Sequence, residues 1–344
     1  MLRAARNHCN RSCGSGANGL TRACRRWSLA ALLAALLAPS SLPAADLAVP
    51  ECVISGFEDG ARFQVPRGVA LDPLREELVV ANTGDHRVEI FSDRGRPLGR
   101  FIHYVTLPDG STAPGLPRAV AVLPTGRIAL TDNLVPTVDI LDRRGNVITT
   151  ISLPSSSKSA PQALALTPDG GLLIAGPPGD DRVYRFDATF HLTATWGVRG
   201  REPGQLNTIA GLVVLPDRRV AVACIQTRLA VQIFSFDGAY LTGFGIHEIG
   251  HGNFSVPSGI TATSDGRIWV ADEVRQVVQV FDKDGALLGM LGGFGLAPGD
   301  INYPSALAGD GRNRIVVAER ELGRVQILIA TRGGEVSGQN ARNQ

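Results

Sequence analysis

The chain repeats one pattern, in which four short apolar runs alternate with polar turns. In the copy at residues 257–291, the apolar runs cover residues 259–262, 268–271, 277–281 and 286–291. Asp-Gly pairs close two of the gaps, and an Asp-Gly pair between apolar runs is a strong signal for a β-hairpin. Each copy is therefore predicted to be a four-stranded antiparallel meander. Because one such sheet cannot bury both of its faces alone, the copies must pack against one another.

The copies follow one another at a regular interval. In each copy one opening residue precedes the first apolar run, and neighbouring opening residues are 44 to 51 positions apart. An interval of this length, with four strands per copy, is typical of the blades of a β-propeller. The opening residues are Pro66, Pro117, Pro161, Ile209, Pro257 and Pro304.

The sixth copy lacks a fourth apolar run, because the pattern stops after residues 327–329. Residues 51–56 form an unassigned run at the other end of the pattern. A propeller ring leaves no incomplete blade when strands from both ends of the chain share one sheet. We therefore expect an all-β fold, a six-bladed β-propeller of four-stranded antiparallel blades whose last blade is closed by the N-terminal strand.

Residues 1–45 have the composition of a secretory signal peptide. Their first part is basic and contains no acid, residues 28–38 are apolar, and residues 39–45 are mostly small residues and prolines. This order of regions is typical of an export signal, although Arg25-Arg26 leaves both the general and the twin-arginine route open. An uncleaved anchor is the alternative, but its apolar part is short for a spanning helix. We expect a signal peptide at 1–45, a propeller at 51–330 and a disordered tail at 331–344.

Charge and cysteine content narrow the range of partners. Six of the 34 basic residues and none of the 32 acidic ones lie in residues 1–45, so the rest of the chain is mildly acidic. A nucleic-acid partner needs a basic footprint, and we therefore expect none. Only Cys52 and Cys224 lie outside the leader, which is too few for a disulfide framework. We expect an exported monomer, periplasmic or extracellular, with no transmembrane domain after cleavage of the signal.

The repeats resemble the NHL-repeat family of six-bladed β-propellers. The resemblance lies in the motifs Pro-x-Gly-Val/Ile-Ala, Asp-Gly-x-Ile/Leu-x-Val-Ala-Asp/Asn and Arg-Val-x-Ile/Val-Phe-x-x-x-Gly, and it extends over residues 51–330. It implies the propeller fold, but this fold hosts both binding proteins and enzymes. The family's members include protein- and RNA-binding scaffolds, and a peptide α-amidating lyase whose metal is held by histidines in the central channel.

One motif suggests zinc chemistry. Residues 247–251 read His-Glu-Ile-Gly-His, the pattern of zinc proteases, in which a helix places both histidines on one face beside the metal. Here Gly245, Gly250 and Gly252 disfavour a helix, and the segment has the composition of a connector between blades. We interpret the motif as coincidental, and retain His247 and His251 as candidate ligand-binding residues and weak candidates for a metal site.

A second set of candidates lies where the second apolar run of each copy ends. The residues there are Asn82, Asp132, Gly176, Cys224, Asp272 and Glu319, which should gather towards one face of the ring. Their oxygens could line a polar or calcium-binding mouth, or each could cap a loop or pair with a nearby arginine, which we prefer. His86 and His103 fall in loops of the same face, and with His247 and His251 could resemble the histidine set of the lyase. The insertion at residues 109–115 is a further candidate for recognition.

These observations favour an exported, non-catalytic scaffold that binds a protein, peptide or glycan through one face and needs no cofactor. The alternative is a lyase or hydrolase with calcium or zinc at the mouth of the central channel, resembling the peptide α-amidating lyase. The two hypotheses differ in whether at least three of the candidate histidines and carboxylates converge on one point.

Overall fold

The computed structural model describes residues 47–57, 60 and 62–331 of the chain. The predicted signal peptide lies outside these residues, as does all but the first residue of the predicted tail. The described part consists of strands and turns, with one 3₁₀ turn, η2 (Thr83–Asp85). Within these ranges, no helix is long and apolar enough to cross a membrane.

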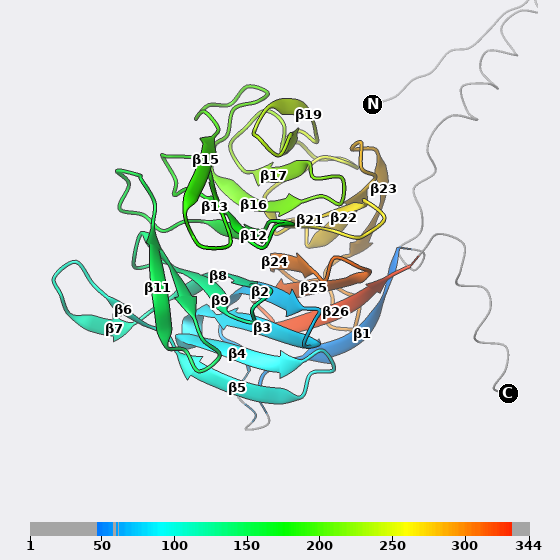
Figure 1. Ribbon diagram of the computed structural model, residues 1–344. Helices are drawn as coiled ribbons and strands as arrows, with labels where there is room; N and C mark the ends of the chain where they lie inside the picture. Colours follow the sequence, from blue (N-terminus) through cyan, green and yellow to red (C-terminus); the bar gives the residue numbers. More distant parts are fainter. Residues whose placement is uncertain (1–46, 58–59, 61, 332–344) are drawn as a thin grey trace, which may run out of the picture. The chain divides into compact units, whose positions relative to one another are not determined.

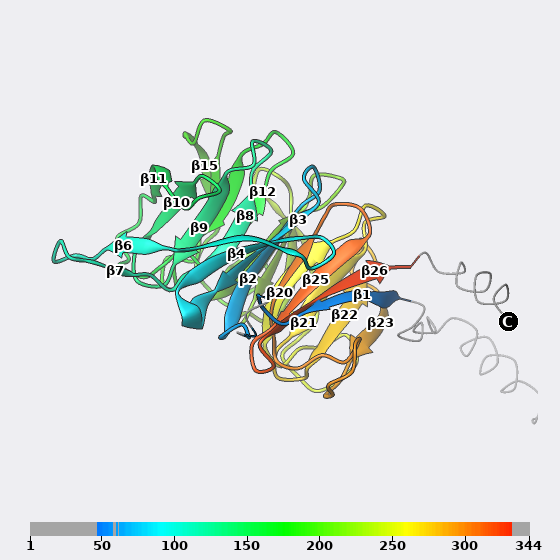
Figure 2. The same ribbon diagram turned by 90° about the horizontal axis from the view of Figure 1, so that it is seen from below.

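Six four-stranded antiparallel sheets are arranged around a central channel, as the repeats predict (Figures 1 and 2). Blade 1 consists of β2 (Pro66–Asp72), β3 (Glu77–Asn82), β4 (Arg87–Ser92) and β5 (Pro97–Ile102). Blade 2 consists of β8 (Pro117–Val122), β9 (Ile128–Asp132), β10 (Thr137–Leu141) and β11 (Val147–Ser152). Blade 3 consists of β12 (Ala163–Leu166), β13 (Leu172–Ala175), β14 (Val183–Phe186) and β15 (Leu192–Trp196).

The other three blades follow the same order, in which the first strand of each lies beside the channel. Blade 4 consists of β16 (Ile209–Val214), β17 (Val220–Cys224), β18 (Val231–Phe234) and β19 (Tyr240–Phe244). Blade 5 consists of β20 (Pro257–Ala262), β21 (Ile268–Asp272), β22 (Val277–Phe281) and β23 (Leu287–Gly292). Blade 6 takes three strands from the end of the chain, β24 (Pro304–Gly309), β25 (Arg314–Glu319) and β26 (Arg324–Ala330).

The fourth strand of blade 6 comes from the other end of the chain, which confirms the predicted closure. Strand β1 (Ala48–Ile54) pairs with β26 in antiparallel register, with Ile54 opposite Val325. It begins three residues earlier than the run expected from the sequence. The side chain of Ile54 is buried, and Arg314 of β25 forms an ion pair with Glu51 of β1. The two chain ends therefore share one sheet, and the ring has no open edge.

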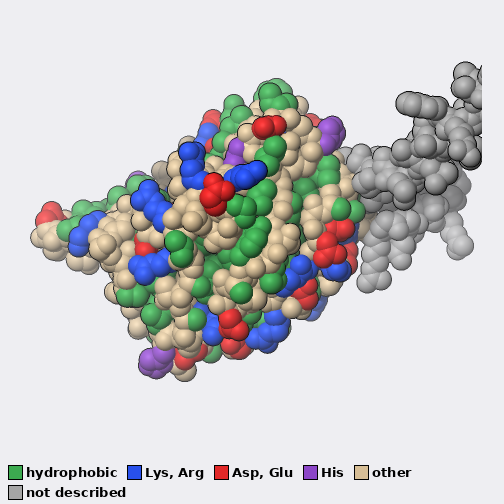
Figure 3. All heavy atoms as spheres, turned by 90° about the horizontal axis from the view of Figure 1, so that it is seen from above, with side chains coloured by type: hydrophobic (Ala, Val, Ile, Leu, Met, Phe, Trp, Pro, Cys, Tyr) green, Lys and Arg blue, Asp and Glu red, His purple; other side chains and the backbone are tan. Residues whose placement is uncertain are grey.

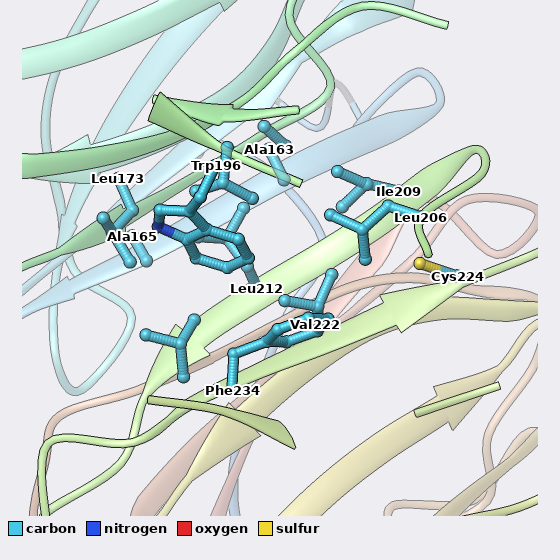
Figure 4. Packing of buried hydrophobic residues seen from close by; sticks show 13 residues of the cluster. Ala163, Ala165, Leu173, Trp196, Leu206, Ile209, Leu212, Val222, Cys224 and Phe234 are labelled. Carbon is cyan, nitrogen blue, oxygen red and sulfur yellow. The ribbon is translucent and has the colours of Figure 1, made fainter. Parts of the chain in front are cut away.

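The hydrophobic core lies between neighbouring blades. Between blades 3 and 4, Trp196, Leu206 and Phe234 pack together with residues of the inner strands (Figure 4). Because each sheet is covered on both faces, its middle strands are apolar without alternation, and all four residues of β13 are buried. Five comparable clusters of buried residues occupy the described part of the chain.

The inner strands approach one another closely around the channel. A Cβ atom on Gly68 would lie 2.1 Å from the carbonyl oxygen of Arg118 in blade 2, and one on Gly259 would lie 2.6 Å from the backbone nitrogen of Leu307 in blade 6. Only glycine allows this contact between backbones. The channel is therefore narrow, with walls fixed by backbone packing.

One insertion departs from the repeat. Between blades 1 and 2, β6 (Tyr104–Thr106) and β7 (Thr112–Pro114) form a hairpin that protrudes from the ring (Figures 1 and 2). Charged side chains of both signs lie among apolar ones in the lobe at the left of the space-filling view (Figure 3), although the hairpin itself contains a single charged residue, Asp109.

Candidate active site at the channel mouth

A cavity of about 100 Å³ lies at the end of the channel where the inner strands begin. We call this end the mouth. Every blade contributes to it the residue that directly follows its opening residue. These mouth residues are Arg67, Arg118, Gln162, Ala210, Ser258 and Ser305.

A β-bulge explains why these residues face the mouth. In five of the six inner strands the register with the second strand shifts at this position, so that Arg67, for example, is skipped between Pro66 and Gly68. In blade 3, Gln162 directly precedes β12. At a β-bulge one residue is left out of the hydrogen-bonded pairing between strands, and its side chain points in a new direction. Such bulges are common beside active sites.

Several polar side chains at the mouth fasten one blade to the next. The hydroxyl of Ser258 donates to the carbonyl oxygen of Pro304 at 2.6 Å, and that of Ser305 donates to the carbonyl oxygen of Pro66 at 2.5 Å. Arg118 Nε donates to the carbonyl oxygen of Gln162 at 3.4 Å. Among the described residues neither serine forms a hydrogen bond with a histidine, so neither is arranged as an activated nucleophile.

The two arginines make the mouth cationic. Arg118 Nη1 donates to Asn133 Oδ1 at 3.2 Å. Within residues 47–57, 60 and 62–331, no carboxylate forms an ion pair with Arg67 or Arg118, and Arg67 makes no hydrogen bond through its side chain. Burial lowers the pKa of Arg118, and the positive charge of Arg67 lowers it further. Arg118 nevertheless remains charged, because even a lowered arginine pKa lies far above neutral pH.

An apolar ring separates the mouth from the rest of the channel. Each inner strand contributes to it the residue two positions beyond its mouth residue, and a larger cavity of about 290 Å³ lies on its other side. This ring, which we call the waist, consists of Val69, Val120, Leu164, Leu212, Ile260 and Leu307. A polar ligand at the mouth would therefore rest on an apolar floor.

The four polar candidates at the ends of second strands do not line the mouth cavity. Asn82 Oδ1 accepts from the backbone nitrogen of Gln64 at 2.7 Å. Asp272 Oδ2 accepts from the backbone nitrogen of Ser255 at 2.6 Å. Glu319 forms an ion pair with Arg324, and burial raises the pKa of this carboxyl despite that partner. These three side chains hold connectors that lead into inner strands, and the fourth, Asp132, contacts a histidine.

His103 joins blade 2 to the base of the protruding hairpin. Its Nδ1 lies 2.9 Å from Asp132 Oδ2 and its Nε2 lies 3.0 Å from Asp139 Oδ2. Burial alone would lower the pKa of His103, but the hydrogen bonds and negative charges of the two carboxylates outweigh it and raise the pKa to about 9. His86 Nδ1 lies 2.6 Å from the carbonyl oxygen of Gly115. Both histidines therefore anchor the insertion between blades 1 and 2.

His247 and His251 lie in the connector between blades 4 and 5, which forms bends and turns. Without a helix, the arrangement of a zinc protease is absent from this segment. His251 is exposed, whereas His247 is half-buried and its Nε2 is enclosed without a hydrogen-bond partner among the described residues. Burial lowers the pKa of His247, which favours the neutral imidazole at neutral pH.

The predicted metal set does not assemble. The part of the chain that the structure describes contains no group of three or more histidine, cysteine, aspartate or glutamate side chains placed to hold a metal ion. Both ring nitrogens of His103 are already bonded to carboxylates, and His86 is engaged with a backbone carbonyl. These residues do not fit the histidine site that the family resemblance implies.

The sequence did contain a signal for the mouth, which our interpretation missed. The mouth residues occupy the same position in all six copies, directly after the opening residue. Our candidates were instead the residues at the ends of second strands and the histidines of nearby loops. The bulge, which decides that the following residue faces the channel, leaves no distinct mark in the hydrophobic pattern.

Comparisons with known proteins agree with the fold. Residues 254–281 match the model of the NHL repeat. A gluconolactonase from Xanthomonas campestris is 18% identical, with a TM-score of 0.57 over 86% of this chain and 99% of that one. Virginiamycin B lyase from Staphylococcus aureus is 14% identical, with a TM-score of 0.55 over 78% of this chain and 96% of that one. A catalytically inactive histidine-to-alanine variant of that lyase, with quinupristin, is 13% identical, with a TM-score of 0.56 over 84% and 97% of the two chains. No curated protein matches the chain in sequence.

The expectation of a non-catalytic binding scaffold is wrong in the light of these comparisons. The similar solved structures include enzymes, a gluconolactonase and virginiamycin B lyase, so the alternative of a lyase or hydrolase fits better than a non-catalytic scaffold. The error came from requiring a metal or nucleophile motif in the sequence before accepting an enzyme. The chain is a six-bladed β-propeller, and its residues 254–281 match the NHL repeat.

Proposed function

We propose that the protein is an enzyme, a lyase or a hydrolase, that acts on a small molecule bound at the mouth of the channel. The observation that carries the proposal is the pair of guanidinium groups, Arg67 and Arg118, that line a cavity without a carboxylate partner among the described residues. The likeness in fold to a gluconolactonase and to virginiamycin B lyase supports the two reaction classes.

The mouth offers what both reaction classes require. Hydrolysis of an ester and elimination beside a carbonyl both place negative charge on a substrate oxygen. Donors that the scaffold holds in place stabilise such charge at little cost of reorganisation, and this is commonly the largest contribution to catalysis. Arg118 is held by Gln162 and Asn133, so at least one guanidinium is fixed before a ligand arrives.

We propose His247 as the proton acceptor. Burial lowers the pKa of His247, which favours the neutral imidazole, and its Nε2 is enclosed without a hydrogen-bond partner among the described residues, next to the mouth cavity's lining in the chain but not part of it. Its connector leads directly into β20, which carries the mouth residue Ser258. The inactive histidine-to-alanine variant of virginiamycin B lyase indicates that a histidine is needed in that enzyme. We also retain export as part of the proposal, on the basis of the apolar run at residues 28–38.

The proposal is tested with a panel of cyclic esters. Ring opening by hydrolysis is followed by acid release, and elimination by the absorbance of the new double bond. We expect Arg67→Met and His247→Gln to lower kcat/KM by about 100-fold, the loss typical of removing one fixed donor or one general base. Arg144→Met is the matched control, because Arg144 is exposed in a turn of blade 2 away from the mouth cavity. Full activity in both Arg67→Met and His247→Gln would refute the proposed site.

A further inference from the structure

The proposed function leaves open what kind of substrate the mouth accepts. We infer that Arg67 and Arg118 form a binding site for an oxyanion, a carboxylate or phosphate group that the ligand carries before any reaction. The inference rests on the proposed function only for calling that ligand a substrate. Its physical basis is the mouth itself.

The first argument is the number of unused donors. A guanidinium carries five N–H groups in a planar fork that matches the oxygens of a carboxylate or phosphate. The contacts of Arg118 use its Nε and Nη1, and no hydrogen bond from the described part of the chain engages the side chain of Arg67. The two side chains come from equivalent positions of adjacent blades and line the same cavity. An anion there would meet two charged donors at once.

The second argument is electrostatic. Two positive groups that share a half-buried cavity repel each other, and burial of Arg118 disfavours its charge further. Among the described residues, no acidic side chain compensates for this repulsion, and none lines the cavity. A bound anion would offset the repulsion between the two guanidinium groups, so the electrostatics of the unliganded mouth favour binding of a negatively charged ligand. Negative charge that develops only during the reaction could be stabilised by neutral hydrogen-bond donors. Two permanently charged groups at one cavity indicate instead a ligand that is negatively charged before the reaction.

The third argument excludes a purely structural role for Arg67. Blades 5 and 6 are fastened to their neighbours by the mouth residues Ser258 and Ser305, so a short neutral side chain suffices for that purpose. The corresponding fastening from blade 1 comes from Thr83, whose hydroxyl donates to the carbonyl oxygen of Pro117 at 2.6 Å. Arg67 therefore makes no such bond to a neighbouring blade within the described residues, and its charged side chain is available to a ligand.

The apolar waist adds a constraint on the ligand. Val69 and Val120 lie two positions beyond the two arginines on the same inner strands, and the four other waist residues complete a ring below the mouth. A small, fully hydrated ion would gain no binding free energy from contact with this apolar waist. A compact molecule with an anionic group at one end and an apolar or weakly polar body fits both parts of the cavity.

The test is direct binding of simple probes, measured by titration calorimetry with the wild-type propeller. Benzoate and inorganic phosphate are the two anionic probes, each compared with chloride at the same ionic strength. Benzamide is the neutral counterpart of benzoate. We expect saturable binding of at least one anion, no binding of benzamide, and tighter binding of whichever anion the natural ligand carries.

Variants assign the binding to the arginine pair. We expect Arg67→Met to weaken anion binding at least tenfold, which corresponds to about 1.4 kcal/mol. Arg67→Lys should recover part of the affinity, because it restores the charge without the fork. Arg144→Met should bind like the wild type. If Arg118→Met fails to fold, Arg67→Met alone decides the question, because the side chain of Arg67 makes no hydrogen bond or ion pair among the described residues.

The outcomes separate this inference from the proposed function. If neither anion binds better than chloride, or if Arg67→Met binds as well as the wild type, the anion site is refuted even when the enzyme is active on neutral esters. If the anions bind through Arg67 but do not inhibit the enzyme, the site stands and the proposed location of catalysis is wrong.

Discussion

The clamp of His103 between Asp132 and Asp139 makes the stability of the fold depend on pH. His103 is 2% exposed, and its pKa is raised from 6.5 to about 9 by the two carboxylates. Below pH 6.5 the imidazole is protonated in both the folded and the unfolded chain, and the clamp contributes fully. As the pH rises through 9 the folded protein also loses the proton, and the contribution disappears.

The expected size of the effect follows from that shift. One pKa unit corresponds to 1.36 kcal/mol, so the free energy of unfolding should fall by about 3 kcal/mol between pH 6.5 and 9 because of this one residue. His103→Gln cannot carry the charge and should lack this part of the pH dependence. The difference in stability between wild type and variant should therefore be largest at pH 6 and should shrink as the pH rises.

Urea unfolding followed by the fluorescence of Trp196 and Trp269 would measure these free energies across the pH range, since both indoles are buried in the ring. His191→Gln is the matched control, because the side chain of His191 is 82% exposed and lies 3.9 Å from its carboxylate partner. Its stability should follow that of the wild type at every pH. Parallel pH profiles for wild type and His103→Gln would show that the clamp holds no extra proton, and the reasoning would fail.

Two further predictions concern the ring. Ile54→Ala should lower the free energy of unfolding by about 2–4 kcal/mol, because it opens a cavity where the two chain ends share a blade. Val49→Ala, on the exposed side of β1, is the control and should lower it far less. Equal losses of stability in urea unfolding would argue against closure of the ring by β1. Gly68→Ala should lower the free energy of unfolding by about 1–3 kcal/mol, because the added methyl group clashes with the next inner strand. A methyl group at Gly99 meets no atom within 4 Å, so Gly99→Ala should be tolerated. A Gly68→Ala variant as stable as the wild type would contradict the close approach of the blades.

The ring could be predicted from the sequence because its information is local and repeated. Turn residues at fixed offsets and apolar runs on both sides of them define every blade, and the missing run after β26 points to β1 as its replacement. The site could not be predicted in the same way. Whether Arg67 faces the channel depends on a bulge, and whether Asp139 meets His103 depends on the path of a connector. Neither changes the periodicity of the chain.

Because of the bulges, the side chains that line the mouth are not the ones on which the pairing of the inner strands depends. A residue that the ladder skips contributes little to the pairing of its strand, so its side chain can be exchanged while that pairing is kept, although exchange of Ser258 or Ser305 also removes a hydrogen bond to the next blade. Nature has already placed arginine, glutamine, alanine and serine at the six equivalent places of this one chain. Ala210 is the small member of the set, and an acid, a base or a metal ligand introduced there would join the existing arginines. Substitutions at these six positions can therefore change the specificity of the mouth while the strand pairing of the propeller is retained.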